Sequence, residues 1–373
     1  MKPGSMKSTR LFLAAVVLAV VAPAASSAST GAAFLSVPMS VRQMGMGNVS
    51  LGGSDVLRAW TNPALLAGVA AGGEATLSGG SLLGGIQSSF GGGLGMAVSP
   101  SWRAGVMFSS NSMEIPIVEA NGDEGGDVVG RRIMSGGLAV AMRTGMVRAG
   151  VGLKSVMDEL MGSRASAVAA DAGIVVGTDE LALGVAMRNM GTVSSNLPGD
   201  RESLPVEFRG GLSFVFKPLS VLAAVEYMKS SDRSGDADAG IAWSPSPVLG
   251  VRMGLAGIKE GGRQVTFGLS GAYQRIVLDY ALGAHPLGLN HRASLTYLFG
   301  PAGGAVAAAA RPQEAPAAVV KEETPPIAPS PAGEVVAPVV STPPLNLAVA
   351  DLGAQNTSPG RNGPCNIVHK PAQ

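Results

Sequence analysis

Hydrophobic and polar residues alternate with a period of two along most of the chain beyond its first seventy residues. Near residue 266, for example, Val265 and Phe267 share one parity and Thr266 has the other. Such alternation is typical of β-strands with one apolar face. Turn residues separate fourteen segments of this kind: 74–81, 84–99, 101–113, 131–143, 146–157, 165–177, 181–190, 205–217, 219–229, 236–244, 247–257, 263–274, 276–285 and 289–299. The pattern predicts an all-β fold of about 14 antiparallel strands.

Charged side chains inside these segments avoid the more apolar parity. Those proposed to face a lumen are Arg148, Lys154, Arg188, Glu207, Arg209, Glu226, Arg252 and Asp279. Arg103, Asp171, Asp238 and Arg292 follow the same parity. A basic side chain on a lipid-facing position near the bilayer midplane costs about 2–4 kcal/mol. The placement suits a transmembrane β-barrel, although a soluble β-sandwich also keeps charge off one face.

The lengths of the connections distinguish these two folds. Short turns are expected at Pro100 and at 144–145, 178–180, 217–218, 245–246 and 274–275. Connections that are mostly longer and more polar alternate with them at 114–130, 158–164, 191–204, 230–235, 258–262 and 286–288. The short loop 286–288 and the first hairpin, near residue 82, fit this alternation poorly. Outer-membrane barrels combine short periplasmic turns with longer external loops, and a sandwich has no reason to do so. Aromatic residues next to the short turns suit a membrane interface: Trp102, Phe214, Phe216, Trp243, Tyr273, Tyr297 and Phe299.

Composition narrows the class of protein further. Charged residues make up 14% of the 373 residues, against roughly 25% in an ordinary soluble domain. A net charge of +1 provides no basic face, so a nucleic-acid partner is not expected. The single cysteine excludes an internal disulfide framework. Without long apolar helices after the N-terminus, the chain is expected to enter a bilayer only as a closed barrel.

The two ends of the chain differ from the strand region. Residues 1–28 combine basic residues, an apolar run and small residues before a cleavage site, as in a secretory signal peptide. The strand region, 73–299, is expected to form the barrel. Residues 300–344 are rich in proline and alanine and are expected to form an extended linker. Residues 345–373 are interpreted as a truncated periplasmic domain or a disordered tail.

Candidate catalytic and metal-binding residues form no convincing site. Residues 45–50 approach a dinucleotide-binding motif but lack its third glycine and a preceding strand. His285 and His291 flank one short loop, His369 is remote, and Cys365 has no partner. The irregularly spaced acidic residues of one connection are better explained as a solvated loop than as a calcium site: Glu114, Glu119, Asp123, Glu124 and Asp127. The sequence predicts no enzyme, no metal and no cofactor.

Residues 29–72 carry two short motifs. The first consists of Arg42, Met44, Gly45, Met46 and Gly47, and the second of Trp60, Asn62, Pro63, Ala64 and Leu66. On these residues the chain resembles the PorV/PorQ family of outer-membrane proteins, which is related to the FadL-type long-chain fatty-acid transporters. The chain departs from the family pattern by an inserted Thr61 and by Leu65 in place of a glycine. The resemblance covers about residues 30–299.

This resemblance implies that residues 29–72 form a hatch, or plug, in the barrel lumen. Its motif residues are Arg42, Gly45, Gly47, Trp60, Asn62, Pro63 and Ala64. From local chemistry, Asn62 is expected to cap a short helix with Pro63 in its first turn. A fourteen-stranded barrel is wide enough to need such filling.

The resemblance also implies a location in the cell outer membrane, in contact with its lipid, and a role as a secretion-associated component. Secretion-system subunits or exported proteins would then be partners. An alternative is a FadL-like channel for hydrophobic small molecules. A further alternative is a soluble periplasmic β-protein used for adhesion or scaffolding.

Overall fold

The computed structural model describes residues 35, 37–53, 55–118, 124–160, 163–178, 180–195, 204–258, 263–286 and 288–299. The chain divides into two units, Met1–Ala317 and Ala318–Gln373, and the described residues all belong to the first. The expected signal peptide, linker and C-terminal piece lie outside the described residues and stay predictions.

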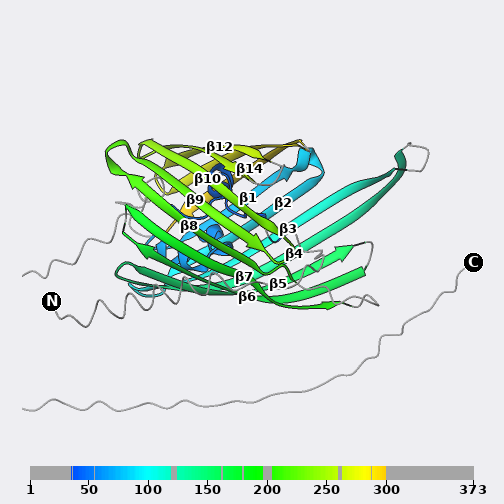
Figure 1. Cartoon of the computed structure of the whole chain (residues 1–373), viewed down its shortest axis with the longest axis horizontal. Coiled ribbons are helices and arrows are strands. Elements are labelled where there is room, and N and C mark those ends of the chain that lie inside the picture. Colours follow the sequence, from blue (N-terminus) through cyan, green and yellow to red (C-terminus); the bar gives the residue numbers. More distant parts are fainter. Residues whose placement is uncertain are drawn as a thin grey trace, which may run out of the picture. The chain divides into compact units, whose positions relative to one another are not determined.

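Fourteen antiparallel strands form one closed barrel in which sequence neighbours pair and β1 pairs with β14 (Figure 1). The strands are β1 (Glu74–Leu82), β2 (Gln87–Ala97), β3 (Trp102–Val118), β4 (Glu124–Thr144), β5 (Val147–Leu160), β6 (Ser163–Gly177), β7 (Leu181–Ser195), β8 (Glu207–Phe216), β9 (Val221–Ser230), β10 (Arg233–Ser246), β11 (Leu249–Ala256), β12 (Gln264–Tyr273), β13 (Ile276–His285) and β14 (Gly288–Leu298). The predicted fold class is confirmed. A single ring excludes the two stacked sheets of a β-sandwich.

The connections alternate between two ends of the barrel. We call the end holding 98–101, 145–146, 178–180, 217–220, 247–248 and 274–275 the turn end, and the opposite end the loop end. The prediction of long connections at 114–130 and 158–164 is wrong, because most of these residues belong to strands. Backbone pairing continues from Glu114 opposite Gly130 to Val118 opposite Glu124. Polar side chains do not stop a ladder made by backbone groups, so β3 and β4 extend as a ribbon beyond their neighbours (Figure 1).

The outward face of the barrel is apolar over most of its height. On β5 it presents Val147, Val151, Leu153 and Met157, which are 38–62% exposed. Ten strand residues tilted as in outer-membrane barrels span about 25 Å, which matches the apolar band of such proteins. The aromatic residues predicted for the membrane interface, Trp102 and Trp243 among them, lie exposed at the turn end. We call this surface the apolar band.

The inward face surrounds the described residues of 35–72, which we call the hatch (Figure 1, blue). Three short helices form it: α2 (Val41–Gly45), η2 (Val56–Trp60) and η3 (Pro63–Gly68), capped by Ser40, Asp55 and Asn62. As expected, the Asn62 side chain accepts a hydrogen bond from the Ala64 amide, and Pro63 begins the helix. No helix in the described ranges is long and apolar enough to cross a bilayer.

The largest apolar core lies between the hatch and the wall. It joins Val56, Leu57 and Trp60 of the hatch to Met107 and Ile133 of β3 and β4. Burial of these side chains stabilises the position of η2 against this side of the barrel. The charged residues of the wall meet the hatch mainly on the opposite side, from β7 to β13.

Candidate functional site

An ion pair joins α2 of the hatch to β13. The Arg42 Nε donates to both carboxylate oxygens of Asp279, at 3.1 and 2.9 Å, and both side chains are at least nine-tenths buried. Ser270 donates a hydrogen bond to the same carboxylate, and Arg252 Nη1 lies 3.4 Å from it. Burial opposes protonation of Arg42, but the carboxylates of Asp279, Asp55 and Glu74 together outweigh it and raise the pKa of Arg42. The wall thus holds a buried hatch cation with a carboxylate of its own.

Two further wall carboxylates bind the hatch backbone. Glu226 accepts hydrogen bonds from the Ser50 amide at 2.5 Å and from the Ser50 hydroxyl at 2.9 Å. Glu74, the first residue of β1, accepts from the Val56 amide at 2.5 Å. Hydrogen bonds with an ionised acceptor are roughly twice as strong as neutral ones. These contacts orient the loop between α2 and η2.

A second charge cluster binds the hatch backbone at two places, Leu35 and Asn48. Glu207 accepts from Arg188 at 2.7 Å and from Arg209 at 2.6 Å. Arg188 Nη2 also donates to the Leu35 carbonyl at 2.9 Å, and Arg209 Nη1 to the Asn48 carbonyl at 3.3 Å. One wall carboxylate therefore orients two arginines that each bind hatch backbone.

Trp60 meets a third charged pair. The Lys154 Nζ lies 5.0 Å from the centroid of the Trp60 ring, within the range of a cation–π contact, and 2.7 Å from Asp171 Oδ2. Because Lys154 and Asp171 are buried on β5 and β6, their pairing and the aromatic contact take the place of lost hydration.

Within the hatch, Asp55 and Arg58 form an internal pair. Arg58 Nε lies 3.1 Å from Asp55 Oδ2, and Asp55 also accepts from the Ser40 hydroxyl at 2.8 Å. Arg58 Nη1 reaches the Ser50 carbonyl at 3.0 Å. Burial lowers the pKa of Arg58, which the neighbouring Asp55 carboxylate partly opposes. This network joins the N-cap of α2 and the following loop to η2, and it was not identified from the sequence.

Glycines of the wall receive the hatch motif. A Cβ on Gly45 would lie 2.9 Å from the Cα of Gly268. A Cβ on Gly254 would lie 2.2 Å from the amide nitrogen of Gly47, whose φ of +68° also favours glycine. Backbones of hatch and barrel are therefore in direct contact at these positions, and a side chain on either partner would separate them.

The second motif meets wall glycines in the same way. A Cβ on Gly150 would lie 2.4 Å from the Pro63 carbonyl carbon, and one on Gly173 would lie 2.0 Å from Asn62 Oδ1. On Gly137 it would lie 2.9 Å from the Trp60 ring. Glycines at inward-facing strand positions are the sequence signal that would have indicated where the hatch packs against the wall.

A cavity of about 380 Å³ opens at the loop end. Its apolar lining comes from the hatch, from β1 and the turn after it, and from β9 and β11: Val37, Pro38, Met44, Leu82, Leu83, Met228 and Ala256. Its charged lining comes from the wall: Arg209, Asp236, Asp238, His285 and Arg292. This volume lies within the range of pockets that hold small molecules. We call it the loop-end cavity.

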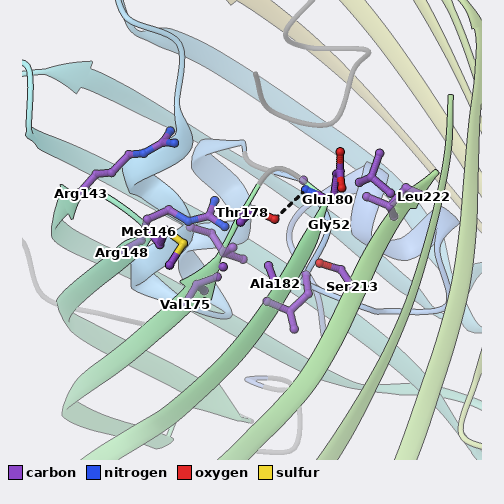
Figure 2. Close-up of a pocket in the computed structure, with 16 residues that line it drawn as sticks. Gly52, Arg143, Met146, Arg148, Val175, Thr178, Glu180, Ala182, Ser213 and Leu222 are labelled. Atoms are coloured by element: carbon purple, nitrogen blue, oxygen red, sulfur yellow. Dashed lines mark hydrogen bonds between the residues drawn. The ribbon is translucent and has the colours of Figure 1, made fainter. Parts of the chain in front are cut away.

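A second, smaller cavity of about 40 Å³ lies near the turn end (Figure 2). Gly52 and Leu65 of the hatch line one side, and Arg148, Ser213 and Leu222 of the wall line the other. Figure 2 shows Arg143 and Arg148 on neighbouring strands at one side of it, with Glu180 across the cavity. We call it the turn-end cavity. The hatch thus lies between two cavities at opposite ends of the barrel.

The structure places the predicted lumen charges and hatch motif as follows. Lys154, Arg188, Glu207, Arg209, Glu226, Arg252 and Asp279 are buried within the barrel, and Arg148 lies at the turn-end cavity. The motif residues Arg42, Gly45, Gly47, Trp60, Asn62, Pro63 and Ala64 all lie in the hatch. Of these lumen charges, Arg188, Arg209, Glu226 and Asp279 hydrogen-bond the hatch directly.

The histidines and acidic residues considered for metals lie apart. His285 lines the loop-end cavity, whereas His291 is hydrogen-bonded to the Tyr280 hydroxyl, at 2.6 Å, on the outward face. Glu114, Glu124 and Asp127 belong to β3 and β4 rather than to a loop, and Glu119 and Asp123 lie outside the described residues. Within the described part of the chain, no group of three candidate ligands could hold a metal.

Comparisons with known proteins concern the fold. No family model and no curated protein matches the chain. The toluene transporter TodX of Pseudomonas putida is 16% identical, with 68% of this chain aligned to 96% of that one and a TM-score of 0.49. A deltaS2 variant of the TodX monoaromatic hydrocarbon channel is 14% identical, with 70% aligned to 99% and a TM-score of 0.52.

A FadL homologue of Pseudomonas aeruginosa is 11% identical, with 70% of this chain aligned to 98% of that chain and a TM-score of 0.47. The TM-score of 0.52 with the TodX variant shows that the two chains share the overall barrel fold. The finer resemblance to the PorV/PorQ family is not matched by any family model and stays a prediction.

Proposed function

We propose that this protein is an outer-membrane channel for hydrophobic small molecules, in which the hatch closes the lumen and must shift for passage. The observation that supports this proposal is the placement of the hatch, whose described residues are mostly buried and lie in the barrel between the loop-end and turn-end cavities. A molecule that enters the loop-end cavity reaches the other side only if the hatch moves.

The exposed surface supports a membrane location. Within the barrel strands, charged side chains described on the outward face lie only at the loop end: Glu114, Arg132, Glu159, Arg164 and Lys229. Below them the apolar band extends to the aromatic residues of the turn end. Because outer-membrane barrels have short periplasmic turns, the turn end faces the periplasm and the loop end faces the exterior.

The loop-end cavity supports the substrate class. Apolar hatch side chains such as Val37 and Met44 line the cavity together with the wall cations Arg209 and Arg292. This lining suits a molecule with an apolar body and one polar end. The similar TodX variant is a monoaromatic hydrocarbon channel. A molecule of that size fits a cavity of about 380 Å³.

The secretion role was the first expectation from the sequence, and these observations favour its alternative. Apolar packing joins the hatch to β3–β6, and charged groups of β1 and of β7 to β13 hydrogen-bond it. A polypeptide in transit would need most of this buried interface to be released. A small molecule needs only a local displacement of one hatch segment.

Uptake by cells tests the proposal. Cells that lack the gene are compared with cells carrying it on a plasmid, and entry of a radiolabelled monoaromatic hydrocarbon is measured. Faster entry with the protein supports the channel. Equal entry in both strains, combined with retention of exported proteins in the deletion strain, would overturn it in favour of secretion.

Fractionation tests the location independently. The protein is expected in the outer-membrane fraction, with a gel mobility that changes on heating because a folded barrel resists detergent. Recovery in the periplasmic fraction with a constant mobility would contradict the membrane location.

A further inference from the structure

Three charged side chains lie next to one another on the outward face at the loop end of β4, β5 and β6. Arg132 pairs with Glu159 across β4 and β5, and Glu159 pairs with Arg164 across β5 and β6. Their common parity places them on the same face as the exposed Met134 and Met157. They therefore form a row directly beyond the edge of the apolar band.

A groove of about 250 Å³ runs beneath this row. Met134, Met157 and Ser166 occupy the next outward register positions, where Met134 pairs with Met157 and Met157 with Ser166. The two methionine side chains are 38% and 47% exposed. The groove thus has a charged rim toward the exterior and an apolar floor toward the bilayer, and we call it the rim groove.

The rim groove carries an excess of positive charge. Arg132 and Arg164 both line it, and Glu159 is the outward carboxylate between them. The Arg164 side chain is 71% exposed and lies 3.5 Å from Glu159, and Arg132 is the register partner of Glu159 on the other side. Asp158 also lines the groove, but its carboxylate is already paired with Arg131. Among the residues that the structure describes, no carboxylate forms an ion pair with Arg132, so the row has one positive charge in excess.

We propose that the rim groove binds the phosphate headgroup of an anionic lipid of the outer leaflet. The planar guanidinium groups of Arg132 and Arg164 donate paired hydrogen bonds to phosphate oxygens, a geometry that suits arginine better than lysine. The acyl chains then lie along Met134 and Met157 on the apolar band. The depth of the row, about 25 Å from the turn end, is that of a lipid headgroup.

Binding of a defined lipid to the purified full-length protein tests this. Native mass spectrometry from detergent counts bound molecules of a bisphosphorylated glucosamine lipid and of the same lipid after removal of its phosphates. The Arg132→Gln/Arg164→Gln double variant should bind the phosphorylated lipid about tenfold more weakly or worse, since each lost bond involves a charged group. Glu159→Gln should bind it more tightly, because it removes the only carboxylate of the row.

Lys229→Gln is the matched control. Lys229 is an exposed, outward-facing cation at the loop end of β9, outside the rim groove. Its removal should leave lipid binding unchanged. Unaltered binding in the double variant, or equal binding of the dephosphorylated lipid, overturns the proposal. Displacement of the lipid by an equal concentration of inorganic phosphate overturns it as well, because free phosphate makes no contact with the methionine floor.

The inference rests on the proposed membrane location but not on the substrate of the channel. Heat-modified mobility of each variant shows that the barrel has folded. A folded barrel that carries hydrocarbon normally but binds no phosphorylated lipid would refute the lipid site alone.

Discussion

Arg42 and Asp279 lie 237 residues apart and form a two-bond ion pair in the barrel interior. Arg42 belongs to the hatch and Asp279 to β13, so this pair connects the segment that closes the lumen to the wall. Because Arg252 and Ser270 share the same carboxylate, Asp279 anchors both the hatch and the adjacent wall.

Asp279→Asn should destabilise the folded barrel by about 3–5 kcal/mol, because Arg42 and Arg252 would stay buried without their counter-charge. Urea unfolding from lipid vesicles measures the change. Glu180→Gln is the control, since Glu180 and Lys217 form an exposed pair whose loss should cost no more than about 1 kcal/mol. Equal effects of the two substitutions would show that the Arg42 pair does not hold the hatch.

Gly254→Ala should displace the hatch. Its new Cβ would lie 2.2 Å from the Gly47 amide nitrogen, and neither backbone can move aside easily. Overpacking of this kind costs about 1–3 kcal/mol. Gly271→Ala on β12 is the control, because no atom lies within 4 Å of its added Cβ. Protease access to the hatch in the folded protein is expected to rise only for Gly254→Ala, and protection in both variants would contradict the backbone contact.

Trp60→Ala should cost about 3–5 kcal/mol, since it empties the core between η2 and the wall and exposes Lys154 to a cavity. Trp60→Phe keeps most of the packed volume and an aromatic face for Lys154, and should lose clearly less. Thermal loss of the compact gel mobility measures both. A Phe variant as unstable as the Ala variant would argue against the ring contact.

The three tryptophans should respond differently to brominated lipid. Trp102 and Trp243 are 47% and 49% exposed on the outward face, whereas Trp60 is 4% exposed inside the barrel. Variants that retain a single tryptophan, reconstituted in brominated lipid vesicles, are expected to be quenched strongly for the first two and weakly for Trp60. Strong quenching of Trp60 would place the hatch in contact with lipid.

The barrel was predictable from the sequence because the alternation of apolar and polar residues along a strand is a local pattern. Alternation such as Val265, Thr266 and Phe267 requires only neighbouring residues, and the strand count and inward charge parity followed from it. The lengths of β3 and β4 were underestimated for the same reason. A polar stretch around Glu114 has the composition of a loop, yet its backbone continues the ladder to Val118.

The partners of the hatch were not predictable in this way. Arg42 and Asp279 were each identifiable from the sequence as candidate residues. Because the lumen holds several charges of both signs, the sequence does not show that these two form a pair. The contact of Gly47 with Gly254 and the cap and ion pair of Asp55 depend on how the chain folds back into the barrel. Such contacts are set by the three-dimensional path of the hatch rather than by spacing.

The claim that the hatch gates the lumen is tested most directly by crosslinking the hatch to the wall. Ser50 and Glu226, whose side chains are hydrogen-bonded at 2.9 Å, are both replaced by cysteine in a Cys365→Ser background and joined by the shortest bismaleimide. Entry of a monoaromatic hydrocarbon into protein-containing vesicles is followed before and after joining, with Ser50→Cys alone as the control. The account predicts that crosslinking abolishes entry in the double variant and leaves the single variant unaffected. Undiminished entry through a fully crosslinked protein would contradict the claim that the hatch gates the lumen.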